Sequence, residues 1–260
     1  MRSRSMMTTA ILGLGEAGSL YAAGFLDCGF TVHGYDPFVS GTPEGIRRFD
    51  SLEDAVSSAD LVISLVGASV SKKVADEALP LVPEGAVFAD FNTGSPQVKK
   101  AVADRASEFG VLFADVAVLA PVPRAGVLTP LTVSGTGASA FTSVMEPTGT
   151  EIDCIHGAAG DAASRKLLRS VFMKGLAAVV LESVTAAEAA GQATWLRDQI
   201  VAELDGAGDE LIERLVTGSR KHAIRRAHET SDAAAYLDDL NVPNWSTAAA
   251  NAWLSSLADS

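Results

Sequence analysis

The sequence predicts an α/β protein in which a doubly wound parallel sheet, residues 1–156, precedes a smaller all-helical domain, residues 157–260. Apolar runs typical of buried strands alternate with helical patterns up to about residue 150. From Gly160 onward the chain is rich in alanine and nearly free of strand-like segments. We place the hinge between the two domains at residues 156–160.

A glycine-rich turn lies between the first expected strand, residues 10–12, and the first expected helix. In this context the pattern G-x-G-x-x-G is the Rossmann-type fingerprint for a dinucleotide. The first glycine makes the tight turn, the second admits the pyrophosphate, and the third lets helix and strand pack closely. Free N–H groups at the start of the helix would bind the phosphates. The expected cofactor-binding residues are Gly13, Leu14, Gly15, Glu16, Ala17 and Gly18.

Asp36 ends the next expected strand, residues 30–36, at the position where an acid bonds the adenosine ribose. Pro37 and Phe38 follow it, so no arginine stands beside it in the sequence. An acid without a neighbouring base disfavours the 2′-phosphate of NADP, so we expect NAD, with NADP as the alternative cofactor. The competing interpretation, a glycine turn that binds nothing, is disfavoured because strand, spacing and acid all occur together.

The remaining elements of the first domain follow in order. We expect a loop at 40–50, a short helix from Ser51, strands at 60–66, 86–90, 111–118, 131–134 and 152–155, and helices at 72–79 and 96–109. Ligands bind at the carboxyl ends of parallel strands, so further cofactor contacts are expected there. Those residues are Val66, Gly67, Asn92 and Thr93.

Composition limits the classes of function. With 48% hydrophobic and 20% charged residues, the 260-residue chain has a globular composition, and its net charge of −12 argues against nucleic acid or an anionic membrane as the main partner. Cys28 and Cys154 are interpreted as small buried residues, and the four histidines lack ligand-like spacing, so no metal site is predicted. No apolar core of a secretory signal and no transmembrane run is found, so we expect a cytoplasmic protein.

Several motifs resemble those of the β-hydroxyacid dehydrogenases, the group of 3-hydroxyisobutyrate and 6-phosphogluconate dehydrogenases. Residues 13–18 are similar to that family's G-L-G-x-M-G, with Ala17 in place of methionine. Residues 90–96 resemble D-x-S-T-x-x-P, whose threonine lies near the nicotinamide, and residues 115–120 occupy the place of D-A-P-V-S-G. Residues 157–160, followed by Lys166, resemble the G-x-x-G stretch and the catalytic lysine on the long interdomain helix.

The resemblance implies an NAD(P)-dependent oxidoreductase that transfers a hydride between nicotinamide and a hydroxy acid or a related sugar acid or polyol. The chain departs from the pattern where the family holds its substrate: Leu119 and Ala120 replace Ser-Gly, and Ser170 replaces the usual asparagine. Residues 166–175 resemble a divergent, phosphogluconate-dehydrogenase-like subgroup with a helical C-terminal domain of unknown function. The expected substrate-binding residues in these segments are Val118, Leu119, Ala120 and Ser170.

Two lysines are candidates for the acid/base. Moving a hydride from an alcohol carbon requires a base for the hydroxyl proton, and a lysine serves if its pKa is lowered. Lys166 and Lys174 are spaced i, i+8 around Ser170, so they share a helix face and would lower each other's pKa by repulsion. Lys166 is the first candidate by its place in the family pattern, and Lys174 is the second. The alternative is a pair of solvated surface lysines.

A basic stripe is expected on a helix near the C-terminus, where His222, Arg225, Arg226 and Glu229 are spaced i, i+3, i+4, i+7. In an acidic protein this stripe would bind an anionic substrate, chiefly through His222 and Arg226, or close a subunit interface. The equally weighted alternative is a solvated face with an Arg225–Glu229 pair.

Other functions remain open on the same fold. An imine reductase or an oxidative decarboxylase would fit the changed Leu119-Ala120 segment, and a non-catalytic dinucleotide-binding regulatory protein would fit the loss of the family asparagine. The expected partners are a small, anionic substrate and a second copy of the chain. The alanine-rich helical domain, with Trp195, Trp245 and Trp253, predicts a homodimer.

Overall fold

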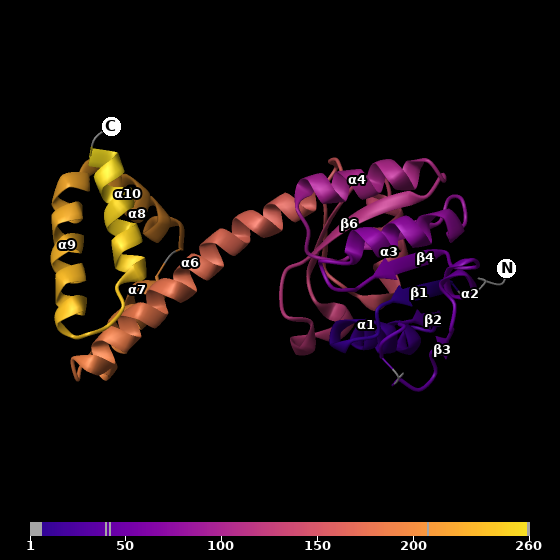
Figure 1. The fold of residues 1–260 in the computed structure, drawn as a ribbon, viewed down its shortest axis with the longest axis horizontal. Coiled ribbons are helices and arrows are strands. Elements are labelled where there is room, and N and C mark those ends of the chain that lie inside the picture. The colour runs from indigo at the N-terminus through magenta and orange to yellow at the C-terminus, as the bar shows by residue number, and fades with distance from the viewer. Residues whose placement is uncertain (1–6, 40, 42, 207, 259–260) are drawn as a thin grey trace. The chain divides into compact units, whose positions relative to one another are not determined.

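The computed structural model describes residues 7–39, 41, 43–206 and 208–258. The chain divides into two compact units, the first ending at Arg169 and the second beginning at Ser170 (Figure 1). Residues 1–6, at the N-terminus where no secretory signal is predicted, lie outside the described residues, as do residues 40 and 42 of the expected loop.

The first unit is built on one eight-stranded sheet with the strand order β3-β2-β1-β4-β5-β6-β7-β8. Strands β6 and β7 pair antiparallel, and the other neighbouring pairs are parallel. The strands are β1 Thr8–Leu12, β2 Thr31–Tyr35, β3 Arg47–Arg48, β4 Leu61–Ser64, β5 Val87–Asp90, β6 Leu112–Val118, β7 Leu131–Ser134 and β8 Ile152–Cys154.

Helices connect and cover these strands. They are α1 Glu16–Asp27, α2 Leu52–Val56, α3 Ser71–Ala78, α4 Pro96–Ser107, α5 Ala138–Met145 and the start of α6, Asp161–Ala189, with short 3₁₀ turns at 79–81, 122–124, 126–128 and 146–148. The Ser51 hydroxyl caps α2 by accepting a hydrogen bond from the Asp54 N–H. Ser95 caps α4 in the same way, directly before Pro96 at the first helical position.

Both faces of the sheet are buried. Successive strand residues point to opposite sides, and helices cover each side. On one side Ile11 packs with Phe25 of α1 and Phe141 of α5. On the other side Leu12 packs in a second cluster that includes Phe88 and residues of α2, α3 and α4. The doubly wound α/β fold is therefore confirmed. Cys28 and Cys154 are partly buried against the first cluster.

Two features of the first unit differ from the expectation. The loop predicted at 40–50 contains the short strand β3, whose Arg47 and Arg48 pair with β2. Its two arginines give no apolar signal, so a hydrophobic pattern cannot reveal it. Residues 119–130 contain 3₁₀ turns in place of a crossover helix, and β7 runs back antiparallel to β6.

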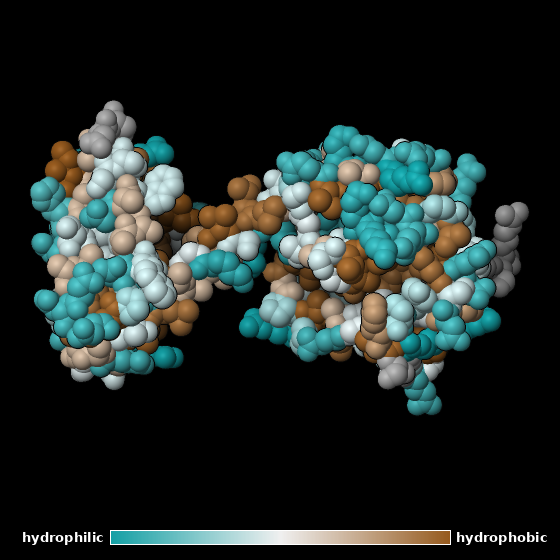
Figure 2. All heavy atoms as spheres, in the orientation of Figure 1, coloured by the Kyte–Doolittle hydropathy of each residue, from teal (hydrophilic) through white to brown (hydrophobic). Residues whose placement is uncertain are grey.

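The described residues of the second unit form helices joined by short turns, without a strand. It contains the rest of α6 together with α7 Ala193–Leu204, α8 Gly208–Lys221, α9 Ala223–Asp239 and α10 Trp245–Ala258. The three tryptophans are largely exposed in the single chain. Their role in an interface remains a prediction. Figure 2 shows apolar side chains gathered along the exposed part of α6.

Helix α6 runs through the junction of the two units. The sequence predicts the domain boundary at residues 156–157, shortly before α6 begins at Asp161, whereas the compact units divide within the helix, between Arg169 and Ser170. Lys166 therefore belongs to the first unit, and Ser170 and Lys174 belong to the second. Within the described ranges, none of the helices combines the length and apolar character needed to cross a membrane.

Candidate functional site

The three motif glycines meet different surroundings at the end of β1. Gly13 has a φ of +95°, and a Cβ there would lie 2.3 Å from the carbonyl oxygen of Leu65. A Cβ at Gly18 would lie 1.9 Å from the carbonyl oxygen of Gly13, whereas a Cβ at Gly15 would meet no atom within 4 Å. The first and third glycines are thus required by packing, and the second faces open space.

Gly15 is also the N-cap of α1, and no side chain caps that helix start. The positive end of a helix with open space before it suits a phosphate. A cavity of about 420 Å³ continues from this point, within the size range of ligand sites. Its lining includes predicted cofactor residues from three strand ends, Gly13, Gly15, Asp36, Val66 and Gly67. These observations fit the pyrophosphate and adenosine of a dinucleotide.

Asp36 is held by the backbone at the rim of this cavity. Its carboxylate accepts hydrogen bonds from the N–H groups of Leu14 at 2.8 Å, Phe38 at 2.8 Å and Val39 at 3.0 Å. Burial alone would raise the pKa of Asp36, but these bonds and the charge of Arg48 outweigh it, so the pKa lies below its usual value. The carboxylate is therefore ionised near neutral pH.

Arg48 corrects the expectation that no base stands near Asp36. Strand β3 brings its guanidinium to the carbonyl oxygen of Asp36 at 2.6 Å, although the two residues are twelve positions apart in the sequence. The pairing of β3 with β2 creates this contact, so the residues directly after Asp36 in the sequence do not reveal it.

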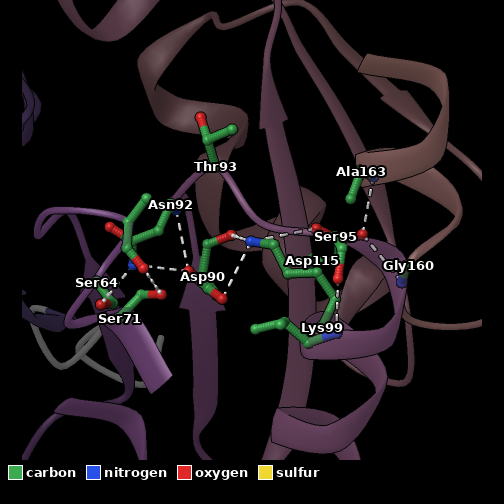
Figure 3. A network of polar contacts seen from close by, with 12 residues as sticks. Ser64, Ser71, Asp90, Asn92, Thr93, Ser95, Lys99, Asp115, Gly160 and Ala163 are labelled. Atoms are coloured by element: carbon green, nitrogen blue, oxygen red, sulfur yellow. Dashed lines mark hydrogen bonds and ion pairs between the residues drawn. The ribbon is translucent and has the colours of Figure 1, made fainter. Parts of the chain in front are cut away.

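A second polar cluster lies at the end of β5 and beside the middle of β6, and it is buried (Figure 3). Lys99 of α4 is only 1% exposed. Its ammonium donates to the carbonyl oxygen of Asp90 at 2.8 Å and lies 3.0 Å from the Asp90 carboxylate and 3.4 Å from that of Asp115. Two carboxylates thus share one buried ammonium, which we call the Asp90–Lys99–Asp115 triad.

Asp115 connects this triad to the start of α6. One of its carboxylate oxygens accepts hydrogen bonds from the N–H groups of Gly160 and Ala163, each at 3.0 Å. The hydroxyl of Ser134 on β7 accepts from the Ala162 N–H at 3.1 Å. Strands β6 and β7 therefore cap the helix that carries Lys166.

Asn92 and Thr93 follow β5 and differ in orientation. The Asn92 amide points inward and donates to the Asp90 carboxylate at 2.7 Å and to the Ser64 hydroxyl at 2.9 Å. Thr93 is exposed, and its hydroxyl accepts a hydrogen bond from the Lys166 amine at 3.3 Å. Thr93 and Lys166, which are 73 positions apart, thus lie together beside a cavity of about 10 Å³ that Lys99 and Asp115 also line.

The pKa of Lys166 is lowered, first by partial burial and then by the positive charge of Lys99, while Asp115 opposes the shift. The spacing on the helix predicts that Lys174 is the repelling lysine, whereas in the structure the repelling charge is that of Lys99. The sequence does indicate that Lys99 is buried, because it shares the core-facing side of α4 with Val102 and Ala106 at i+3 and i+7. A lysine on an apolar face needs buried partners.

The remaining predicted residues fall elsewhere. Val118, Leu119 and Ala120 are half-buried at the end of β6, and Lys174 is exposed in the second unit, which also contains Ser170. The basic stripe lies at the start of α9, where His222 is the N-cap and Arg225, Arg226 and Glu229 are helical. The residues before it belong to a separate helix, since α8 ends at Lys221. Arg226 donates to Ser219 at 2.8 Å and Arg225 to Glu229 at 2.8 Å, so local contacts engage both guanidinium groups.

An open glycine loop, an ionised acid after β2 and a lysine beside the end of β5 define a dinucleotide-binding domain of the dehydrogenase and reductase class. Residues 8–155, more than half of the chain, match the family described as the NAD binding domain of 6-phosphogluconate dehydrogenase, and the chain belongs to this family. The resemblance drawn from the motifs is thus confirmed. Residues 187–257 match a family described as a domain of unknown function (DUF1932).

Individual relatives agree with this assignment. A probable 3-hydroxyisobutyrate dehydrogenase of Mycobacterium bovis is 29% identical over 72% of this chain and 66% of its own length. An imine reductase from Myxococcus stipitatus, solved with NAD⁺, is 18% identical with a TM-score of 0.81 and covers 98% of this chain and 94% of its own. A reductive aminase from Aspergillus terreus, solved with NADPH and ethyl levulinate, is 16% identical with a TM-score of 0.80 over the same shares. The two structures share the fold.

Proposed function

We propose that the protein is an NAD(P)-dependent oxidoreductase that transfers a hydride between nicotinamide and a hydroxy acid or a related sugar acid or polyol, with Lys166 as the acid/base. One observation carries the proposal. The amine of Lys166, whose pKa is lowered, lies 3.3 Å from the hydroxyl of Thr93 at the carboxyl end of β5. A lysine with a pKa moved toward neutrality, beside a strand end of a dinucleotide-binding sheet, is suited to proton transfer.

The residues that would hold the cofactor lie along the strand ends. At the start of α1 the N–H groups of Glu16 and Ala17 would bind the pyrophosphate. The Asp36 carboxylate would bind the adenosine ribose hydroxyls, and Thr93 would lie near the nicotinamide. The nicotinamide, when bound, supplies or accepts the hydride. The protein's part is to bind, to orient and to move the proton.

Lys166 moves that proton in both directions. In oxidation the neutral amine takes the proton of the substrate hydroxyl, and in reduction the ammonium returns a proton to the carbonyl oxygen. Burial and the charge of Lys99 favour the neutral amine, so the base form is available at a lower pH than for a free lysine. We therefore expect oxidation to rise with pH through the pKa of Lys166, and reduction to fall.

NAD is the preferred cofactor in this proposal, and NADP is the alternative. The ionised Asp36 carboxylate repels a 2′-phosphate, while the nearby charge of Arg48 reduces that repulsion. Titrating NADH and NADPH against the wild type and Asp36→Ser tests the balance. Tighter NADPH binding in the variant is the expected result, and unchanged relative affinities would remove Asp36 from cofactor selection.

The decisive experiment compares two lysine variants. NADH binding and turnover of hydroxy acids, phosphorylated sugar acids and cyclic imines are measured for Lys166→Ala and, as the matched control, Lys174→Ala. We expect Lys166→Ala to bind NADH but to lose about 10²- to 10⁴-fold in turnover, with Lys174→Ala close to wild type. Normal turnover in Lys166→Ala would reject the role of Lys166, and loss only in Lys174→Ala would transfer it.

Imine reduction and oxidative decarboxylation are the second candidates, favoured by Leu119 and Ala120 where the resembling family holds a carboxylate. The same substrate panel separates them, since activity on cyclic imines alone indicates a reductase and release of carbon dioxide indicates decarboxylation. NADH binding without turnover of any substrate would favour a regulatory protein.

We also propose a homodimer that covers exposed apolar residues of the second unit. Phe172 of α6 is 63% exposed, Trp245 is 79% exposed and Trp253 is 72% exposed in the single chain. Exposed apolar surface of this extent is typical of an interface. Light scattering of the purified protein tests the proposal, and a monomer at micromolar concentration would contradict it.

A further inference from the structure

The buried ammonium of Lys99 calls for an explanation beyond packing. It is 1% exposed, and the carboxylates of Asp90 and Asp115 beside it are equally withdrawn from water. Taking such ions out of water costs several kcal/mol each, and an apolar side chain of similar volume is often as stable or more so. The contacts of the triad show what the charges accomplish.

The triad joins the two segments that carry Thr93 and Lys166. Lys99 holds the end of β5 through the Asp90 carbonyl oxygen at 2.8 Å, and Asp90 in turn accepts a hydrogen bond from the N–H of Asn92 at 3.0 Å, directly before Thr93. Fixing Asp90 therefore fixes the segment that presents the Thr93 hydroxyl.

The other arm of the triad reaches α6. Asp115 binds Lys99 with one carboxylate oxygen and the N–H of Ala163 with the other. Lys166 follows Ala163 at i+3, on the same side of the helix and one turn further along. Lys99 thus lies at the centre of a set of contacts that begins at Thr93 and ends at Lys166.

We propose that Lys99 is a positioning residue for Lys166. Lys99 joins the end of β5 to the start of α6 and so holds the Lys166 amine beside the Thr93 hydroxyl. The inference rests on the proposed role of Lys166 as acid/base. Lys99 does not touch the reacting atoms; it acts through Asp90, through Asp115 and through its charge.

The charges around Lys166 support this role. Lys99 of α4 lowers the pKa of Lys166, and Asp115 of β6 raises it. Asp90 of β5 is paired with Lys99 at 3.0 Å. On α6 itself, Arg165 is paired with Asp153 at 3.1 Å. Lys99 is thus the cation that favours the neutral form of Lys166.

The test measures the titration of Lys166 in the protein without cofactor. The rate at which acetic anhydride acetylates Lys166, which depends on the neutral amine, is followed by peptide mass spectrometry from pH 6 to 11 in the wild type and in Lys99→Met. We expect the midpoint for Lys166 to rise, because a repelling charge is lost. The matched control is Lys100→Met, which removes an exposed ammonium from the same helix and should leave the midpoint unchanged.

A second variant covers the risk that Lys99→Met does not fold, since that change leaves two buried carboxylates without their cation. In Lys99→Met/Asp115→Asn one of those charges is removed, and the asparagine carbonyl still accepts from the start of α6. Lys99 has the larger effect on Lys166, so the midpoint should still rise, but less than in the single variant. An unchanged midpoint in either folded variant would overturn the proposal.

Enzyme kinetics then separate this inference from the proposed function. In Lys99→Met, the pH at which the oxidation rate reaches half its plateau should move upward with the acetylation midpoint, while NADH affinity stays the same. A shifted acetylation midpoint with an unmoved rate profile would retain Lys99 as the group that controls Lys166 and would reject Lys166 as the acid/base.

Discussion

Both units cap a helix with a carboxylate, but the first carboxylate is buried and the second is only partly buried. Asp115 accepts two backbone N–H bonds at the start of α6 and is fully buried, with Lys99 against its other oxygen. Glu182 accepts from the N–H groups of Ser246 and Thr247 at 2.6 and 2.7 Å at the start of α10, and it is only partly buried. The first unit places its charged cap in the interior, where it fixes the candidate site, and the second uses the same contact near the surface.

The two units also differ in what they do with apolar side chains. In the first, clusters on both faces of the sheet are closed to water. In the described part of the second, the buried apolar residues are Ala187, Ala223, Leu237 and Val242, and larger side chains stay exposed. The first unit therefore contains the closed core beside the candidate site, and the second leaves exposed the apolar surface that the proposed dimer would cover.

Removing the interior cap should have the largest effect. Asp115→Ala leaves the Lys99 ammonium and the first N–H groups of α6 with fewer partners in a dry site, so the free energy of unfolding should fall by about 3–5 kcal/mol. Urea denaturation measures it. Ser134→Ala, which removes one neutral hydroxyl from the same helix start, should cost about 1 kcal/mol. Equal losses would show that the buried charge is unimportant.

Placing a charge on the exposed face of α6 tests the second half of the comparison. Phe172→Glu should convert the proposed dimer to a monomer at micromolar concentration, because a carboxylate cannot be buried there without a partner. Sedimentation velocity reads the mass. Lys100→Glu, on the surface of the first unit, serves as the control and should leave the mass unchanged. A Phe172→Glu dimer would place the interface elsewhere.

Two glycines in open space should respond differently to a methyl group. Gly15→Ala should fold normally but weaken NADH binding about tenfold or more, since its Cβ enters the space assigned to the pyrophosphate. Gly175→Ala, within α6 of the second unit, should bind NADH normally and gain up to about 1 kcal/mol from helix propensity. Fluorescence titration and thermal unfolding measure both. Wild-type affinity in Gly15→Ala would contradict the placement of the phosphates.

The surface cap should matter least. Glu182 has a pKa below its usual value: burial would raise it, but the hydrogen bonds from Thr247 and Ser246 outweigh that effect. Glu182→Gln should therefore cost about 1 kcal/mol above that pKa, or about 2–4 °C in Tm, with the difference from wild type shrinking as pH falls through it. Glu188→Gln, exposed on the same helix, should cost almost nothing. A loss as large as that of Asp115→Ala would remove the distinction between the two units.

Local patterns predicted much of the fold and the cofactor cavity. The glycine turn, the Ser95-Pro96 helix start and the apolar runs of the parallel strands act through neighbouring residues, and the strand-end rule brought Val66 and Gly67 to the same cavity as Asp36. These features depend on short-range chemistry that a sequence displays directly.

What the sequence did not predict depends on distant pairs. Arg48 reaches Asp36 only because β3 pairs with β2, and Lys99 has its partners only where β5, β6 and α4 meet. The reversal of β7 has a similar origin, since the connecting residues show 3₁₀ turns where a crossover helix would be needed. Charge pairing across a sheet leaves no periodic pattern in one sequence.

The hydrogen bond that the Ala163 N–H donates to Asp115 fixes the rotation of α6 about its own axis at this point. Each added residue turns everything beyond it by about 100°. One residue inserted between Ala163 and Lys166 would therefore swing the amine away from Thr93, whereas one inserted after Ser170 would leave the amine in place. The few residues between the cap and the lysine thus tolerate substitution far better than a change in their number.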